Sequence, residues 1–168
     1  MNEHSFVAIL MGSDSDLPSL EGMFEILRHL KIKHEVNILS AHRTPEETVV
    51  YVKQAEQRGC KIFIAAAGLA AHLAGSVAAH TLKPVIGIPL VSGEAGFSGL
   101  DALLSTVQMP PGIPVACVSV GKVGAKNAAF LAAQILAIDD LSLHEQLIQL
   151  RAEKKSELLK KNEALKIS

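Results

Sequence analysis

Residues 6–31 read FVAILMGSDSDLPSLEGMFEILRHLK, and they contain two different hydrophobic periodicities. The first six residues are all apolar, which is typical of a strand buried on both faces of a parallel sheet. Over residues 17–31 the apolar side chains recur at helical spacing, at Leu20, Phe24, Leu27 and Leu30. That spacing predicts an amphipathic helix. A buried strand that runs directly into a helix is the repeating unit of an α/β protein.

The same alternation continues along the chain. Further strands are predicted over residues 35–39, 61–66, 85–89 and 115–120, and further helices over residues 45–59, 70–81, 100–107, 123–137 and 141–161. With right-handed crossovers, this order gives a doubly wound parallel sheet in a flavodoxin-like, three-layer α/β/α fold with an extra C-terminal helix. We expect one catalytic domain over residues 1–168, with an α/β core at 5–140 and a C-terminal helical arm at 141–168.

The composition disfavours a nucleic-acid-binding or membrane-spanning protein and favours one with buried subunit contacts. Sixteen Lys and Arg against 17 Asp and Glu give a formal charge of −1, which predicts neither nucleic-acid binding nor a charged tail. An apolar fraction of 49% favours a well-filled core together with apolar surface buried between subunits. Residues 62–79 are mostly Ala and Gly, so we expect a buried strand and helix there and no membrane span.

The two cysteines and the N-terminal residues indicate the cellular compartment of the protein. Cys60 and Cys117 lie in or beside apolar strand-like runs without CxxC spacing, so they are expected to be core thiols of a reducing cytosol. The first twelve residues, MNEHSFVAILMG, lack a signal-peptide pattern. We therefore expect a cytoplasmic protein.

Ligands of an open parallel sheet bind beyond the carboxyl ends of its strands. The first such loop, GSDSD at 12–16, opens a helix with small and hydroxyl side chains that suit an anion. Asp16 would repel a phosphate, so it better suits ribose hydroxyls. The alternative is ordinary helix capping by Ser and Asp, which accounts for some of these residues. The loop matches neither GxGxxG nor GxxxxGK[ST], the dinucleotide and triphosphate signatures.

The second loop, SAHRTP at 40–45, combines a cation with an imidazole. Arg43 stands beside a helix start, where guanidinium and helix dipole both favour a phosphate. Thr44 is predicted to cap that helix in a capping box closed by Glu47. His42 is placed to meet the reactive end of a ligand, although a histidine in a loop is as often an ordinary surface residue.

The later loops are rich in small residues. Residues 67–75, AGLAAHLAG, can expose backbone amides to a carboxylate or simply pack tightly, and local evidence makes His72 structural. Residues 92–99 are either a lid or a plain surface loop. The sequence has no HExxH, no Cys/His cluster and no GxSxG, so neither a metal nor a serine nucleophile is predicted.

Seven blocks of sequence, in order between residues 6 and 138, carry a family resemblance. They are MGSDSD at 11–16, SAHRTP at 40–45, AAHL at 70–73, PVIGIP at 84–89, GLDALLS at 99–105, VQMP at 107–110 and KNAA at 126–129. These blocks resemble the phosphoribosylaminoimidazole carboxylase catalytic-subunit family in its bacterial class, the 5-(carboxyamino)imidazole ribonucleotide mutases. The SAHRTP and QMP blocks are the most specific.

The resemblance implies an isomerase of de novo purine (IMP) biosynthesis that is a homo-octamer and uses no metal or organic cofactor. It implies that His42 is the general acid and base. It further implies substrate-binding roles for these residues: Ser40 and Arg43 at the phosphate, Ser13 and Asp16 at the ribose, and Gly68, Ala70, His72 and Leu73 around the migrating carboxylate. An imidazole exchanges a proton near neutral pH, as a carboxylate migration from nitrogen to carbon requires.

The chain also departs from the family pattern. Gly68-Leu69 replaces a usual glycine pair, Ala74 replaces proline, and the loop at 90–98 is about two residues longer than in the usual family pattern. These changes concern the carboxylate site and the lid. Two alternatives remain: direct carboxylation of aminoimidazole ribonucleotide, whose enzymes usually carry Lys where Arg43 stands, and a non-enzymatic nucleotide-sensing or receiver module.

Overall fold

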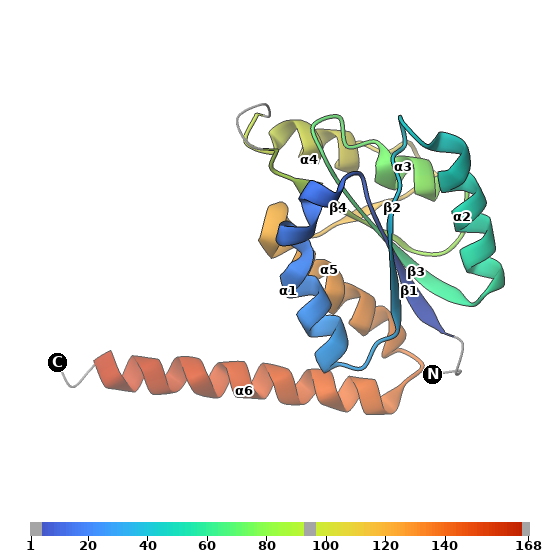
Figure 1. The fold of residues 1–168 in the computed structure, drawn as a ribbon. Helices are drawn as coiled ribbons and strands as arrows, with labels where there is room; N and C mark the ends of the chain where they lie inside the picture. The colour runs from blue at the N-terminus through green and yellow to red at the C-terminus, as the bar shows by residue number, and fades with distance from the viewer. Residues whose placement is uncertain (1–4, 93–96, 166–168) are drawn as a thin grey trace.

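The computed structural model describes residues 5–92 and 97–165. Its strands are β1 (Phe6–Met11), β2 (His34–Ile38), β3 (Cys60–Gly68), β4 (Val85–Leu90) and β5 (Ala116–Cys117). Its helices are the short 3-10 helix η1 (Asp14–Asp16) and α1 (Leu17–His29), α2 (Pro45–Gln57), α3 (Leu73–Ala78), α4 (Leu100–Val107), α5 (Gly121–Leu136) and α6 (Leu141–Leu165). Figure 1 shows the strands as one twisted sheet with helices on both sides.

The strands are parallel and lie in the order β2-β1-β3-β4-β5. This order, with helices on both faces, confirms the predicted flavodoxin-like α/β fold. The register aligns the carboxyl ends of the central strands: Met11 pairs with Ile38 and with Ala66, and Gly68 pairs with Leu90. The strand order reverses between β1 and β3, and at this switch point the loops diverge to leave a crevice.

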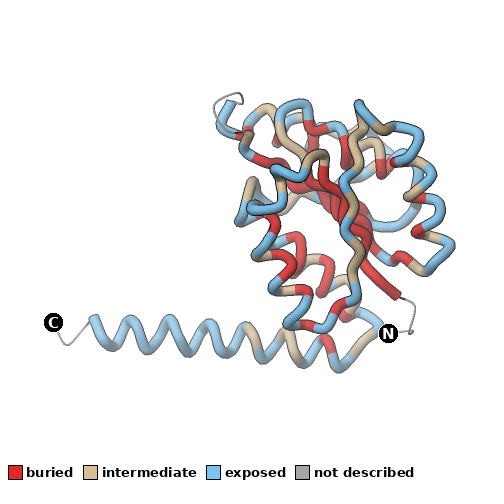
Figure 2. Tube along the Cα trace, in the orientation of Figure 1, coloured by how far each residue is buried: buried red, intermediate tan, exposed pale blue. Residues whose placement is uncertain are grey.

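The core lies on both faces of the sheet, because β1 and β4 are apolar along their whole length and β3 is apolar from Ile62 onward. On one face Val7, Ile9 and Ile64 pack against α1, α5 and the start of α6. On the other face Leu10 and Phe63 pack against α2 and α3, and α4 covers β4 there. In Figure 2 the central strands are accordingly buried, whereas most of α6 is exposed.

Helix α3 and strand β5 are both shorter than predicted. Helix α3 begins at Leu73 instead of residue 70, because the His72 amide donates to the Ala70 carbonyl in a tight turn at 2.8 Å. Residues 70–72 are therefore loop residues at the end of the sheet. At the other edge β5 has two residues instead of six, because Ser119 (φ 119°) turns the chain into α5 from Gly121.

The predicted capping box at Thr44 and Glu47 is wrong. Thr44 is the N-cap residue of α2 and Pro45 opens the helix, but the Thr44 side chain bonds backward to the loop. Its Oγ1 accepts from the Ser40 amide at 2.8 Å and donates to the Ser40 carbonyl at 3.2 Å. Local side-chain bonds of this kind compete with capping. A capping box is present instead at Ser13 and Asp16, at the start of η1.

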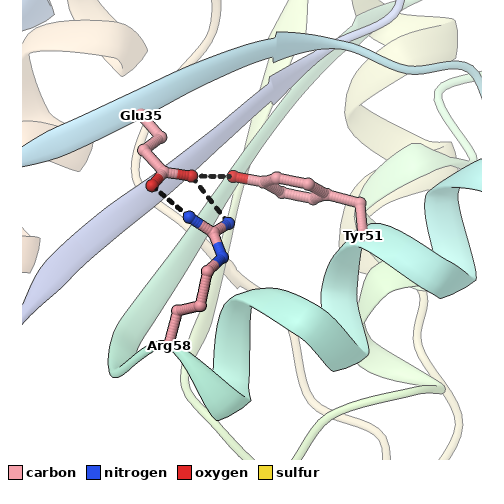
Figure 3. A network of polar contacts seen from close by, with 3 residues as sticks. All are labelled: Glu35, Tyr51 and Arg58. Atoms are coloured by element: carbon pink, nitrogen blue, oxygen red, sulfur yellow. Dashed lines mark hydrogen bonds and ion pairs between the residues drawn. The ribbon is translucent and has the colours of Figure 1, made fainter.

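A polar network fastens the edge strand β2 to helix α2 (Figure 3). The Arg58 guanidinium forms an ion pair with the Glu35 carboxylate, and the Tyr51 hydroxyl donates to the same carboxylate at 3.2 Å. The hydrogen bonds and charge of Arg58 hold the pKa of Glu35 below its usual value. Burial, followed by the negative charge of Glu35, raises the pKa of Tyr51 far above its usual value. This network lies away from the crevice and is structural.

Helix α6 extends beyond the body of the protein (Figure 1). Leu143 is 2% exposed and packs against the core beside Leu147 and Leu150, whereas residues 151–165 are exposed. Within residues 5–92 and 97–165, no helix combines the length and apolarity that crossing a bilayer requires. The lid predicted at 92–99 includes residues 93–96, which lie outside the described residues.

Candidate active site

A pocket of about 510 Å³ opens at the carboxyl ends of β1 to β4, at the switch point of the sheet. Its lining residues are Gly12, Ser13, Ser15, Asp16, Ser40, Ala41, His42, Arg43, Ala67, Gly68, Leu69, Ala70, His72, Leu73 and Ser92. The volume suits a ligand the size of a nucleotide. All nine residues that the sequence predicted for the site line this one pocket.

The loop after β1 supplies hydroxyls and a carboxylate. Ser13 Oγ accepts from the Ser15 amide at 3.3 Å, and Asp16 Oδ2 accepts from the Ser13 amide at 3.0 Å. The predicted helix capping is confirmed at η1. The residues that cap η1 also line the pocket, so their ligand-binding role stays a prediction. Burial raises the pKa of Asp16 above its ordinary value, against the opposing effects of the Ser13 amide and the Arg43 charge.

The loop after β2 is held rigid by Ser40. Its hydroxyl accepts from the amides of Arg43 at 3.2 Å and of His42 at 3.4 Å, while its own O–H is left to donate. The Arg43 guanidinium reaches across to β1, where Nη2 donates to the Gly12 carbonyl at 2.5 Å. Arg43 lines the same pocket as Ser13 and Ser40, and a guanidinium with hydroxyls suits a phosphate.

His42 and His72 are hydrogen-bonded to each other across the pocket. His42 Nε2 lies 2.8 Å from His72 Nδ1, and the two rings meet edge to face with centroids 5.0 Å apart. One of these nitrogens must donate and the other accept, so the proton position on one ring fixes that on the other. The local sequence predicted a structural role for His72. In the structure His72 directly contacts His42, the predicted general acid and base.

The floor of the pocket follows β3. A Cβ on Gly68 would lie 1.9 Å from Ser92 Oγ, so any larger residue at the end of β3 would require the Ser92 side chain to move. Leu73 is 2% exposed and forms part of the pocket floor. Ser92 and Ser15 are lining residues that were not among the predicted site residues. Their positions after β4 and β1 are the signal that identifies them.

Metal ligation has no support in the described residues: within them, no three His, Cys, Asp or Glu side chains gather in a way that would hold an ion. The groups that the pocket does present are a guanidinium, several hydroxyls, one carboxylate and a pair of imidazoles. Groups of these kinds can bind anions and sugar hydroxyls and can transfer protons. Fold and pocket together define a flavodoxin-like α/β protein with a polar ligand site at its switch point.

Comparison with known proteins identifies the family. The AIR carboxylase family matches residues 6–157. The N5-carboxyaminoimidazole ribonucleotide mutase of Escherichia coli strain K12 is 48% identical over 158 residues, covering 94% of this chain and 92% of the relative. That of Pyrococcus abyssi is 50% identical over 149 residues, covering 89% and 83%. The crystal structure of Treponema denticola PurE superimposes with a TM-score of 0.82 at 31% identity, covering 93% of this chain and 95% of that chain. The chain belongs to the AIR carboxylase family.

Proposed function

We propose that this chain moves the carboxylate of N5-carboxyaminoimidazole ribonucleotide from the exocyclic nitrogen to ring carbon C4. The product is 4-carboxy-5-aminoimidazole ribonucleotide, and the reaction is an isomerisation in de novo purine (IMP) biosynthesis. The observation that carries the proposal is one pocket that joins the His42–His72 pair to Arg43 and a set of serine hydroxyls. The names of relatives near 50% identity over most of the chain support the mutase reaction.

The polar groups fix the orientation of the substrate. The phosphate binds at Arg43 and at the free O–H of Ser40, both on the loop that opens α2. The ribose binds at Ser13 and Asp16, where a carboxylate accepts from sugar hydroxyls. This arrangement directs the imidazole ring of the substrate toward His42, because the residues that bind the phosphate and the ribose lie on His42's own loop and on the neighbouring loop. Several fixed contacts far from the reacting atoms hold the ring in a reactive position.

His42 carries one proton through the reaction. The protonated imidazole gives its proton to the exocyclic nitrogen while the nitrogen–carboxylate bond breaks, which releases carbon dioxide and leaves an amine. Ring carbon C4 then attacks the carbon dioxide and forms the new carbon–carbon bond. The now neutral His42 removes the C4 proton, so the histidine returns to its starting state and the net change is an isomerisation. The floor at Gly68, Ala70 and Leu73, with His72, receives the carboxylate.

A paired assay tests this reaction. Purified protein is given 5-(carboxyamino)imidazole ribonucleotide in one arm and aminoimidazole ribonucleotide with carbon dioxide in the other, and both arms follow the C4-carboxylated product. We expect efficient turnover in the first arm and far slower turnover in the second. Turnover in the second arm alone would make the chain a direct carboxylase. The absence of product in both arms would favour a non-enzymatic module.

We also propose that the protein is a homo-octamer of the cytoplasm. The support is family resemblance together with unpartnered apolar surface: Leu100, Leu104 and Val107 on one face of α4 are each close to half exposed. The exposed half of α6 is the arm that contacts a neighbouring subunit. The free thiols of Cys60 and Cys117 suit a reducing compartment.

Light scattering in solution tests the assembly. We expect a mass about eight times the 17.8 kDa of one chain. Replacing Leu100 and Leu104 together by serine should reduce that mass, because polar side chains remove the apolar contact between subunits. A wild-type protein that stays monomeric at high concentration would overturn the octamer and leave the apolar face of α4 without a partner.

A further inference from the structure

Ser92 is a pocket residue to which the proposed mechanism assigns no task. It lies two residues beyond the end of β4, is partly buried, and lines the pocket together with residues of the loops after β1, β2 and β3. Ligands of an open parallel sheet bind at the carboxyl ends of its strands. The loop after β4 is therefore as well placed to contact the substrate as the other three.

The Ser92 hydroxyl lies against Gly68. A Cβ built on Gly68 would lie 1.9 Å from Ser92 Oγ and 3.2 Å from Ser92 Cβ. Gly68 pairs with Leu90, so this contact joins the ends of two adjacent strands, β3 and β4. Gly68 belongs to the floor that receives the carboxylate in the proposed mechanism. The hydroxyl of Ser92 is therefore placed at the carboxylate end of the pocket.

The Ser92 hydroxyl is also an available donor. A serine hydroxyl can donate one hydrogen bond and accept two. None of the residues in 5–92 and 97–165 is hydrogen-bonded to Ser92 Oγ, whereas Ser13 Oγ donates to the Asp14 carboxylate at 3.0 Å. The Ser92 O–H is thus left for a ligand.

Few other polar side chains are present at this end of the pocket. The lining residues at the end of β3 and on the loops after β3 and β4 are Ala67, Gly68, Leu69, Ala70, His72, Leu73 and Ser92. Of these, His72 and Ser92 have polar side chains, and His72 Nδ1 is already bonded to His42. A carboxylate bound here meets the unpaired O–H of Ser92, and a hydrogen bond to a charged acceptor is stronger than one between neutral groups.

We propose that Ser92 is a substrate-binding residue that donates a hydrogen bond to the carboxylate on ring carbon C4. This inference deepens the proposed mutase function and rests on it. Free carbon dioxide is neutral, but negative charge returns to its oxygens as C4 attacks its carbon atom. The Ser92 O–H stabilises that charge without transferring its proton, because a fixed donor is most effective where charge develops.

Two ligands that differ only in the carboxylate test this role. 4-Carboxy-5-aminoimidazole ribonucleotide carries the carboxylate on C4, and aminoimidazole ribonucleotide carries hydrogen there. Ser92→Ala removes the O–H, and Ser92→Cys keeps a side chain of similar shape with only a weak donor. Ser142→Ala, at an exposed position of α6 outside the pocket, is the matched control. Titration calorimetry on each full-length protein measures the Kd of both ligands.

We expect both Ser92 variants to raise the Kd of the carboxylated ligand about tenfold, as the loss of a hydrogen bond to a charged group implies. The Kd of aminoimidazole ribonucleotide should stay at its wild-type value, because that ligand has no carboxylate. Ser142→Ala should bind both ligands as wild type does. The thermal midpoint of each variant shows that it folds.

The contrary outcomes separate this role from the proposed function. If wild type rearranges its substrate and the Ser92 variants keep the wild-type Kd for the carboxylated ligand, the role of Ser92 is overturned while the mutase function stands. Equal weakening of both ligands also overturns it, because Ser92 then acts on the shape of the pocket and not on the carboxylate. If wild type forms no rearranged product and binds neither ligand, the proposed function fails, and the role of Ser92 fails with it.

Discussion

Replacing His42 by asparagine is expected to lower kcat by about 10²–10⁴-fold, the usual contribution of a positioned acid/base. Asparagine keeps a polar side chain but ends short of the His42 Nε2 position, so the bond to His72 is lost. The loop should keep its shape, because Ser40 accepts from its backbone amides. It cannot give a proton to the exocyclic nitrogen or remove one from C4. KM should change little, because phosphate and ribose are held by other residues. Steady-state kinetics with 5-(carboxyamino)imidazole ribonucleotide measure both constants.

His29→Asn is the matched control for that experiment. His29 is exposed in the last turn of α1, outside the pocket, so the same substitution there should leave kcat at its wild-type value. Circular dichroism and the thermal midpoint of both variants establish that they fold alike. Rearrangement by His42→Asn at the wild-type rate would remove the His42 imidazole from the mechanism and direct attention to His72.

The regular part of the fold is predictable because its signals are local. Phe6–Met11 and Leu100–Val107 are observed with their predicted bounds, since a continuous apolar run and a helical spacing each suffice to specify them. The strand predicted at 115–120 is shorter because it pairs on one side only, with β4, at two positions. The close start of α5 competes with a longer strand. A Cβ on Gly124 would lie 2.3 Å from the Ser119 carbonyl oxygen, so the first turn of α5 packs tightly against the segment that follows β5.

The site is predictable in its residues but not in its contacts. The rule that ligands bind at carboxyl strand ends brought loops 12–16, 40–45 and 67–75 together without any coordinates. The bond between His42 and His72 joins residues thirty positions apart, and its geometry depends on how two loops turn. The positive φ of Leu69 is equally hidden, because a backbone angle leaves no mark in composition or periodicity.

Replacing Arg43 by methionine is expected to raise KM by about 10–100-fold, because a hydrogen bond to a charged partner contributes roughly 1.5–3 kcal/mol. The side chain is exposed and its visible bond is to the Gly12 carbonyl, so the fold should tolerate the change. kcat should fall less than KM rises, since the phosphate is remote from the reacting atoms. Arg43→Lys should lie between the two, because it keeps the charge but loses the planar set of donors. Michaelis–Menten kinetics at several salt concentrations measure these effects.

Arg28→Met, in the exposed last turn of α1, is the matched control and should leave KM unchanged. The pH dependence adds a second readout, because the positive charge of Arg43 lowers the pKa of Asp16. Without that charge the Asp16 pKa rises, and its carboxylate is protonated at a higher pH. An ionised carboxylate is the better acceptor for ribose hydroxyls, so the rise of KM on the acid side should begin at a higher pH in Arg43→Met than in wild type. An unchanged KM at all pH values would mean that Arg43 does not bind the phosphate, and the serine hydroxyls of the pocket would then be its remaining partners.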